Sequence, residues 1–367
     1  MILMNDFKAE PPELREAMLS AAKRVIDSGW YVLGNEVTSF EKQWAVACGV
    51  GYGVGVGNGM DAIEIALRAL GIGAGDEVIT TPMTAFATVL AIMRAGATPV
   101  LADIDVNSAL LSLESAQRCL SSKTKAVLLV HLYGQVRGMA AWQVFCKEQG
   151  IFLLEDCAQA HLAMWQDKVA GSFGEAGAYS FYPTKNLGAP GDAGMLVTDN
   201  AVLAERAGRL RNYGQSVRYH HPELGMNSRL DEIHAAMLSE RMQWLPNFTD
   251  RRRNIAQAYR EGMTNPIVKQ LARPEEPDAH VYHLYVVTCS QRDALQSHLK
   301  SHQVQALIHY PIPVQAQVPC RQIKRDPEGL SASEQHATQC LSLPCHPQMT
   351  EVDVEKVIAV VNSFQGE

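Results

Sequence analysis

Short apolar runs alternate with amphipathic segments along residues 50–200. The apolar runs predict strands at Val78–Thr81, Thr98–Ala102, Ala126–His131, Ile151–Glu155, Ala178–Phe181 and Met195–Thr198. The amphipathic segments predict helices at Asp61–Leu70, Ala85–Ala95 and Met139–Gln149. The run at 127–130 is apolar at every position, which is typical of a strand covered on both faces. The alternation predicts βαβ units and therefore an α/β fold with a mostly parallel central sheet.

A different pattern begins after about residue 230. A long helical stretch runs from Leu230 towards Arg260 and is interrupted at Pro246. It leads to a further strand candidate, Tyr282–Thr288, and to a closing helix, Val352–Phe364. These elements predict a second layer of structure that is separate from the main sheet.

The length of the chain also favours two domains. With 367 residues it is too long for one simple core. We expect a large domain over residues 1–245 and a smaller C-terminal α/β domain over residues 246–367. The stretch from Pro311 to Glu328 is predicted to be an irregular loop on the surface.

Composition and charge exclude several classes of protein. Hydrophobic residues make up 47% and charged residues 19%, which is an ordinary globular balance. No apolar run approaches the roughly 20 residues that a membrane span requires. The start of the chain has no basic region followed by an apolar core, so we expect a cytoplasmic protein without a secretory signal. The net charge of −7 argues against nucleic acid as a main partner.

Cysteine and histidine spacing gives no sign of a metal site. The eight cysteines are scattered and form no C-x-x-C pair, which favours reduced, mostly buried thiols. The histidine pairs His280/His283 and His220/His221 have no cysteine or acidic partner at ligand spacing. We therefore expect no metal.

The glycine-rich run at residues 51–61 is a candidate phosphate site. It contains neither G-x-G-x-x-G nor a P-loop, so a nicotinamide-dependent oxidoreductase is disfavoured. The next residues place apolar side chains on one helical face, so a helix should open at about Gly59. Free backbone N–H groups and the helix dipole at that point could bind a phosphate. A glycine turn needed only for packing is the alternative.

Two side chains could serve pyridoxal phosphate chemistry, which needs an amine for the cofactor aldehyde and a carboxylate for its pyridine nitrogen. Asp156 follows a buried strand at its carboxyl end, where ligands bind in open α/β sheets. Lys185 lies among glycines and small residues, and apolar surroundings lower the pKa of a lysine amine. The alternative for Asp156 is a helix cap or a turn.

Phe86 is a weaker candidate. It follows a predicted strand at the start of a predicted helix, where an aromatic ring could stack on a flat cofactor. Most phenylalanines in such positions are simply part of the core, so this alternative stays open.

Motifs spread over nearly the whole chain resemble one known family. They are Ser28–Gly34, Gly57–Gly59, Gly75–Ile79, Glu155–His161, Ser180–Ala189, Asn227–Glu232 and His309–Pro313. With these motifs the chain resembles the DegT/StrS-type nucleotide-sugar aminotransferases. The resemblance implies the aspartate aminotransferase fold, which is pyridoxal phosphate fold type I, and pyridoxal 5'-phosphate as the cofactor.

The resemblance also implies roles for individual residues. Lys185 would hold the cofactor and move the proton, and Asp156 would contact the pyridine nitrogen. The remaining cofactor contacts would be Gln159 at the ring hydroxyl, Phe86 in the stacking position, and Gly59, Met60 and Ser180 at the phosphate. Asn227 would reach the phosphate from a partner subunit, which implies a homodimer with shared active sites.

Substrate contacts are expected within the same motifs. The candidates are Tyr182, Arg229, His309 and Tyr310. Arg229 belongs to a basic group with Arg209, Arg211 and Arg218 that could bind the diphosphate of a sugar carrier. Ordinary surface arginines are an equally good interpretation of the other three.

The stretch Tyr182–Ala189, followed by Gly191–Gly194, looks most like family members that aminate the C3 position of the sugar. The resemblance therefore implies transfer of an amino group from glutamate to a dTDP-linked 3-keto-6-deoxyhexose. The alternatives are a C4 aminotransferase, a sugar 3-dehydratase and a non-catalytic regulator of the same fold. The dehydratases carry histidine in place of the lysine, and Lys185 is present in this chain.

Overall fold

The structure, a computed structural model, describes residues 1–366. Within them an eight-stranded sheet forms the centre of the molecule, in the order β1-β9-β8-β5-β4-β2-β3-β12. In that order the strands are Tyr52–Val56, Gly194–Thr198, Ala176–Ser180, Phe152–Asp156, Thr124–Val130, Glu77–Thr80, Thr98–Leu101 and Lys324–Arg325. β9 runs antiparallel to both of its neighbours, and the other neighbouring pairs are parallel. The predicted α/β class and mostly parallel sheet are confirmed.

The apolar runs identified from the sequence all lie in this sheet, with ends that differ by one or two residues. Every residue of β2 and of β9 is buried, as expected for strands covered on both faces. The three predicted helices are also present, as α3 (Gly59–Ala69), α4 (Phe86–Arg94) and α6 (Met139–Gln149).

One strand was missed because it is rich in glycine. The run at 51–61 was interpreted as a turn that opens a helix, but Tyr52–Val56 forms the edge strand β1. Its glycines allow other parts of the chain to lie directly against it. A Cβ at Gly53 would lie 2.6 Å from the backbone oxygen of Glu41, and one at Gly55 would lie 2.9 Å from Leu230.

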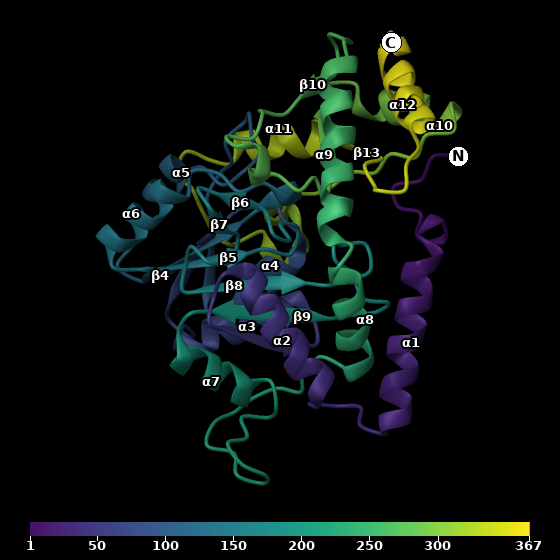
Figure 1. Cartoon of the computed structure of the whole chain (residues 1–367). Coiled ribbons are helices and arrows are strands. Elements are labelled where there is room, and N and C mark those ends of the chain that lie inside the picture. The colour runs from purple at the N-terminus through teal and green to yellow at the C-terminus, as the bar shows by residue number, and fades with distance from the viewer. Residues whose placement is uncertain (367) are drawn as a thin grey trace.

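Helices cover both faces of the sheet. α2 (Asn35–Cys48) and α6 contribute to one core, through Phe40, Trp44, Trp142 and Phe145. α3, α4 and α7 (Ala201–Leu210) contribute to a second core on the other face. Figure 1 shows α1 (Pro12–Ser28) and α8 (Glu232–Met242) side by side at the flank of the sheet, where they pack on each other. The short helix α5 (Leu113–Arg118) and the hairpin of β6 (Met164–Trp165) and β7 (Lys168–Val169) complete this part.

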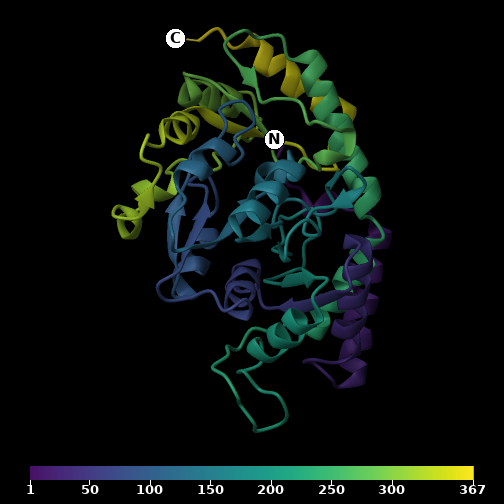
Figure 2. The same cartoon turned by 90° about the vertical axis from the view of Figure 1, so that its left-hand side faces the viewer.

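A second group of elements follows the long helix α9 (Leu245–Gly262). It has a three-stranded antiparallel sheet in the order β10-β11-β13, made of Lys269–Gln270, Tyr285–Thr288 and Cys340–Leu343. The helices α10 (Arg292–Ser301), α11 (Ser331–Gln339) and α12 (Glu351–Ser363) pack with it at one end of the molecule (Figures 1 and 2). Pro246 lies in the first turn of α9, where a proline costs no helical hydrogen bond. The domain division at residue 245 stays a prediction.

The stretch 311–328 is mostly exposed, as the sequence suggested, but it is more regular than the predicted loop. It contains the short helices Val314–Ala316 and Val318–Cys320 and the strand β12, which pairs with β3 in the main sheet. Asp326 is buried, and its carboxylate accepts hydrogen bonds from Arg118 at 2.6 and 2.9 Å. The polar composition of this stretch conceals these contacts, because they depend on partners far away in the chain.

The first residues of the chain lie against the C-terminal group of elements, because Ile2 pairs with Val304 (Figure 1). No helix within residues 1–366 is both long and apolar enough to cross a membrane.

Gly174→Ala should destabilise the protein, because the added Cβ would lie 2.2 Å from the backbone oxygen of Leu153. We expect the free energy of unfolding to fall by about 1–3 kcal/mol, measured by urea unfolding. Gly208→Ala in α7 is the control. Nothing lies within 4 Å of its added Cβ, so alanine should stabilise the helix by about 0.5–1 kcal/mol. Equal effects at the two sites would contradict this account.

Candidate active site

Asp156 is the last residue of β5, at the carboxyl end of the central strands. It is buried, and both of its carboxylate oxygens have partners. Oδ2 accepts a hydrogen bond from the hydroxyl of Thr88 at 2.8 Å, and Oδ1 accepts one from the backbone N–H of Ala158 at 3.1 Å. These two contacts hold the plane of the carboxylate in one orientation.

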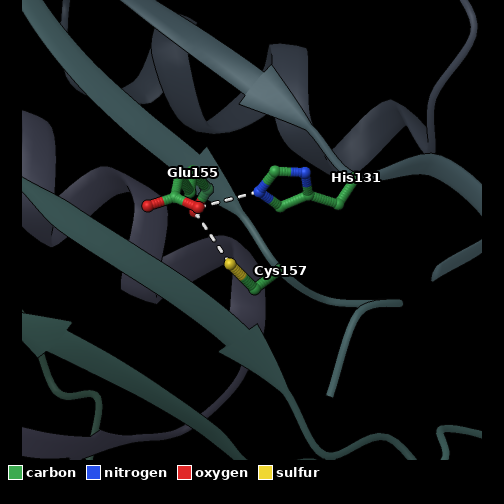
Figure 3. Close-up of side chains that lie close together, drawn as sticks. All are labelled: His131, Glu155 and Cys157. Carbon is green, nitrogen blue, oxygen red and sulfur yellow. Dashed lines mark hydrogen bonds and ion pairs between the residues drawn. The ribbon is translucent and has the colours of Figure 1, made fainter. Parts of the chain in front are cut away.

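Glu155, the residue before it, fixes the end of the strand from the opposite face. Its carboxylate accepts hydrogen bonds from the backbone N–H groups of Gly171, Phe173 and Gly174, at 2.7, 2.8 and 3.0 Å. It also contacts Nε2 of His131 at 2.8 Å (Figure 3). Four contacts to a fully buried carboxylate make this an anchor for β5, because breaking one of them would leave a buried charge without compensation.

The same cluster has the residue types of a metal site. Possible ligand atoms of His131, Glu155 and Cys157 lie within 4.8 Å of one another (Figure 3). However, backbone N–H groups already occupy both oxygens of Glu155. Burial also raises the pKa of the Cys157 thiol well above its usual value, which disfavours the thiolate that a metal needs. Hydrogen bonding therefore accounts for this cluster.

Lys185 lies in the loop that follows β8, in a turn closed by its backbone N–H and the oxygen of Tyr182 at 2.8 Å. Its side chain is partly buried. Burial lowers the pKa of the amine to about 8, and the nearby charge of Asp156 opposes this shift. About a tenth of the amine is then neutral at pH 7, compared with less than about a thousandth for an ordinary lysine.

Three histidines surround the lysine. Burial and the positive charge of Lys185 lower the pKa of His161 to about 3 and that of His309 to about 4. The same two causes lower the pKa of His283 well below its usual value. These rings are therefore neutral at pH 7, and their side chains add no positive charge beside the amine.

The start of α3 lies against the ends of β8 and β9. Asn58 caps the helix by accepting a hydrogen bond from the N–H of Asp61 at 2.9 Å. A Cβ at Gly59 would lie 2.7 Å from that of Ser180, and one at Gly194 would lie 2.4 Å from the backbone of Asn58. The predicted phosphate residues Gly59 and Ser180 are thus adjacent. Met60, the next residue of the helix, is partly buried in the core beneath it.

Gln159 connects the loop after β5 to the C-terminal part of the chain. Its Oε1 accepts a hydrogen bond from the N–H of Tyr133 at 2.6 Å, and its Nε2 donates one to the hydroxyl of Tyr310 at 3.2 Å. The hydroxyl of Tyr133 donates to the backbone oxygen of His309 at 2.7 Å. Burial and the charge of Asp156 raise the pKa of Tyr310 to about 12. His309 and Tyr310 therefore lie close to Asp156 and Lys185.

Phe86 is the first residue of α4, and its side chain is partly buried. It packs with a separate apolar cluster that includes Val89, Leu101 and Val314. Thr88 is two positions further along α4, which is about 200° around a helix, and it is Thr88 that contacts Asp156. The stacking role of Phe86 stays a prediction.

Asn227 and Arg229 lie on or next to an arm formed by residues 212–227, between α7 and α8. Bridges between Asn212 and Asn227 and between Val217 and His220 close the arm at its base and near its tip. Asn227 is exposed, and Tyr182 is exposed beside Lys185. Figures 1 and 2 both show the arm projecting from the body of the molecule.

The basic group divides into two kinds of arginine. Arg209 pairs with Glu205 and Glu223, at 2.6 and 3.2 Å, and Arg211 pairs with Glu41. These two are engaged within the chain, so the structure does not support them as diphosphate ligands. Arg229 donates a hydrogen bond to Asn212 at 3.3 Å and lies over the ring of Tyr213, at 5.4 Å from its centre. Arg218 lies over the ring of Tyr219 near the tip of the arm.

Sequence reasoning missed several residues that shape this site. Thr88 had a faint signal, since it and Thr84 are four positions apart at the start of a helix that follows a strand. His283 had none, because its position in an apolar run looks like a core position. Glu155 was noticed only as the neighbour of Asp156.

Known proteins resemble this chain in sequence and in structure over nearly its whole length. The model of the DegT/DnrJ/EryC1/StrS aminotransferase family matches residues 12–362. A protein of Aneurinibacillus thermoaerophilus, named dTDP-3-amino-3,6-dideoxy-alpha-D-galactopyranose transaminase, is 42% identical across 99% of both chains. The crystal structure of Streptomyces venezuelae DesV in complex with a ketimine intermediate matches with a TM-score of 0.95 and 38% identity, over 98% of this chain and 97% of DesV.

A structure with bound cofactor adds to this comparison. The protein ntda from Bacillus subtilis, with bound cofactor PMP, matches with a TM-score of 0.88 and 27% identity, over 96% of this chain and 82% of ntda. The fold, the motifs and the geometry around Lys185 and Asp156 therefore lead to one conclusion: the chain belongs to the DegT/DnrJ/EryC1/StrS aminotransferase family and is a pyridoxal phosphate-dependent aminotransferase.

Proposed function

We propose that the protein transfers an amino group from glutamate to C3 of a dTDP-linked 3-keto-6-deoxyhexose. The observation that carries this proposal is the pairing of a low-pKa amine, Lys185, with the buried carboxylate of Asp156 in one site. The choice of sugar rests on relatives whose names specify dTDP-3-amino sugars, at 42% and 40% identity over nearly the full chain. The motif around Tyr182–Ala189 supports the same choice of position on the sugar.

The residues present fit pyridoxal phosphate. Asp156 would face the pyridine nitrogen, Lys185 the aldehyde, and Gln159 the ring hydroxyl, to which its second amide hydrogen could be donated. The first N–H groups of α3 have no partner within the helix, and they would hold the phosphate together with Ser180. Gly59 suits this cradle, because a side chain there would fill the space against Ser180. When bound, the cofactor supplies an electron sink for cleavage of a bond at the substrate carbon.

Lys185 is suited to move the proton in this reaction. Its amine has a pKa of about 8, so both the neutral and the protonated forms are populated near neutral pH. The neutral Nζ can accept a proton from a substrate carbon, and the ammonium can return it. The neutral rings of His161, His283 and His309 add no further charge that would lower this pKa.

Four residues are proposed to contact the substrate. Tyr182 is half exposed next to Lys185, and His309 and Tyr310 lie on the loop that closes over Gln159. Arg229 could contribute charge for the diphosphate, since it contacts the uncharged side chains of Asn212 and Tyr213 on the arm. The four candidates come from three different parts of the chain.

The arm supports a homodimer with shared active sites. Its side chains Val217, Tyr219 and Leu224 are 61%, 77% and 88% exposed, which is costly for a free surface and typical of an interface. Asn227 is exposed at the base of the same arm and would reach the phosphate of a partner's cofactor. A contact within one chain is the alternative, because the neighbouring Ser228 accepts a hydrogen bond from Gly57 at 2.9 Å.

The reduced state of the cysteines supports a cytoplasmic location. All eight are free and buried, which suits a reducing compartment.

The function is tested with the cofactor-loaded enzyme in two separate steps. Glutamate alone should yield one equivalent of 2-oxoglutarate for each active site, and the dTDP-3-keto sugar added afterwards should be converted to its 3-amino product, in which the amino group replaces the ketone oxygen. Lys185→Ala should do neither. Amination of a dTDP-4-keto sugar in preference to the 3-keto sugar would contradict the C3 assignment, and no reaction with glutamate would contradict the donor.

The pKa of Lys185 predicts how the stability of the cofactor-free protein changes with pH. Between about 8 and its ordinary value of 10.5, the unfolded chain keeps a proton on this amine that the folded chain has released. Stability therefore rises with pH through this window. Lys185→Met lacks this gain. The free energy of unfolding of the variant, minus that of the wild type, should therefore fall by on the order of 1–2 kcal/mol between about pH 7.5 and about pH 9.5.

Urea unfolding at the two pH values measures this difference. The exposed Lys147→Met is the matched control and should follow the wild type. If the difference in free energy of unfolding between Lys185→Met and wild type does not change with pH, the amine has an ordinary pKa.

Mixing two inactive variants tests the shared site. Lys185→Ala removes the amine, and Asn227→Asp places a negative charge beside the phosphate. If each site combines Lys185 of one subunit with Asn227 of the other, random mixing after unfolding and refolding should restore about a quarter of the wild-type sites. If both residues serve the same chain, mixing should restore none. Each variant refolded alone is the control.

A further inference from the structure

Two threonine hydroxyls connect the start of α4 to Asp156. The hydroxyl of Thr84 lies 2.7 Å from that of Thr88, and the hydroxyl of Thr88 lies 2.8 Å from Oδ2 of Asp156. All three side chains are buried. The contacts therefore form a short relay inside the protein.

The chemistry of the groups sets the direction of the relay. An ionised carboxylate only accepts hydrogen bonds, so the single hydroxyl hydrogen of Thr88 must point to Asp156. Thr88 can then only accept from Thr84, whose own hydrogen points to Thr88. Each bond strengthens the next in a buried environment, because Thr88 is a better donor when it also accepts.

We propose that Thr88 is the positioning residue for Asp156, and that Thr84 supports it through this relay. The proposal rests on the function proposed above, in which Asp156 holds the pyridine nitrogen in its protonated state. Thr88 and the N–H of Ala158 hold one carboxylate oxygen each, which leaves a lone pair on each oxygen for a ligand. Without Thr88 the carboxylate is held at one oxygen only and can rotate away from the nitrogen.

This role predicts a change in the electronic state of the bound cofactor. A protonated pyridine ring withdraws electrons and lowers the pKa of the lysine–cofactor linkage. A misplaced Asp156 holds that proton less well, so the midpoint of the absorbance titration of the linkage should rise. A purely structural role for Thr88 would reduce the stability of the protein and leave this midpoint unchanged.

Thr88→Val is the main test, because valine has the same shape without the hydroxyl. In the holoenzyme we expect the titration midpoint to rise by roughly 0.5–1 pH unit, and the dissociation constant for pyridoxal phosphate to rise by about 5–10-fold. Thr88→Ser, which keeps a hydroxyl, should return both values close to wild type. Thr84→Val should shift the midpoint in the same direction by a smaller amount.

Thr80→Val is the matched control. Thr80 is buried in β2, and its hydroxyl donates to the backbone oxygen of Leu128 at 2.9 Å. The substitution therefore removes one buried hydroxyl hydrogen bond without touching Asp156, and the midpoint should not move although the melting temperature falls. Unfolding of each variant without cofactor separates loss of stability from the spectral effect.

The proposal is overturned if Thr88→Val has the wild-type midpoint, or if Thr80→Val shifts it equally. If Thr88→Val does not fold, Thr84→Val decides the question, and an unchanged midpoint in that variant overturns the relay. Failure of the proposed function is distinguishable from these outcomes. In that case the wild-type protein itself would show no titrating absorbance of a lysine-linked cofactor.

Discussion

The carboxyl end of β5 is held by a buried carboxylate, and the active site depends on that hold. Glu155 accepts four hydrogen bonds, three of them from backbone N–H groups of the loop at 171–174. Successive residues of a strand point to opposite faces, so fixing Glu155 on one face also fixes Asp156 on the other. Asp156 then meets Thr88 of α4 on its own side of the sheet. The end of β5 therefore connects the packing around Glu155 on one face of the sheet with the position of Asp156 on the other face.

Electrostatics around Lys185 follow from the same burial. Desolvation lowers the pKa of the amine and of the three histidines near it, and Asp156 limits the shift of the amine. The three histidine rings are therefore neutral, the amine of Lys185 can change its charge near pH 8, and the carboxylate of Asp156 is held by hydrogen bonds. This is the arrangement that proton transfer at a substrate carbon needs, because the acid and base forms of the same group must both be accessible.

Local patterns in the sequence predicted the strands of the central sheet, the start of α3 and the positions of Asp156 and Lys185. These features depend on hydrophobic periodicity and on residues close together in the chain. Long-range packing decided the features that were missed. The glycines of β1 are needed because Glu41 and Leu230 lie too close to them for a side chain. In the stretch 311–328, Asp326 is buried because it binds Arg118, and β12 forms because it pairs with β3.

The position of Phe86 shows the same limit inside the site. Its place after a strand predicts stacking, and the direction of its side chain depends on the rotation of α4, which the sequence does not show. The structure places Thr88 of the same helix against Asp156. Residue type and spacing therefore predicted Lys185 and Asp156 as the reactive pair, and only three-dimensional packing showed that Thr88 contacts Asp156.

The central claim is that Lys185 carries the cofactor in a site built around Asp156. Borohydride reduction of the protein with pyridoxal phosphate, followed by peptide mass mapping, tests it most directly. The account predicts one phosphopyridoxyl group for each chain, on the peptide that contains Lys185, and none on that peptide in Lys185→Ala. A label on another lysine, or no label after addition of the cofactor, would contradict it.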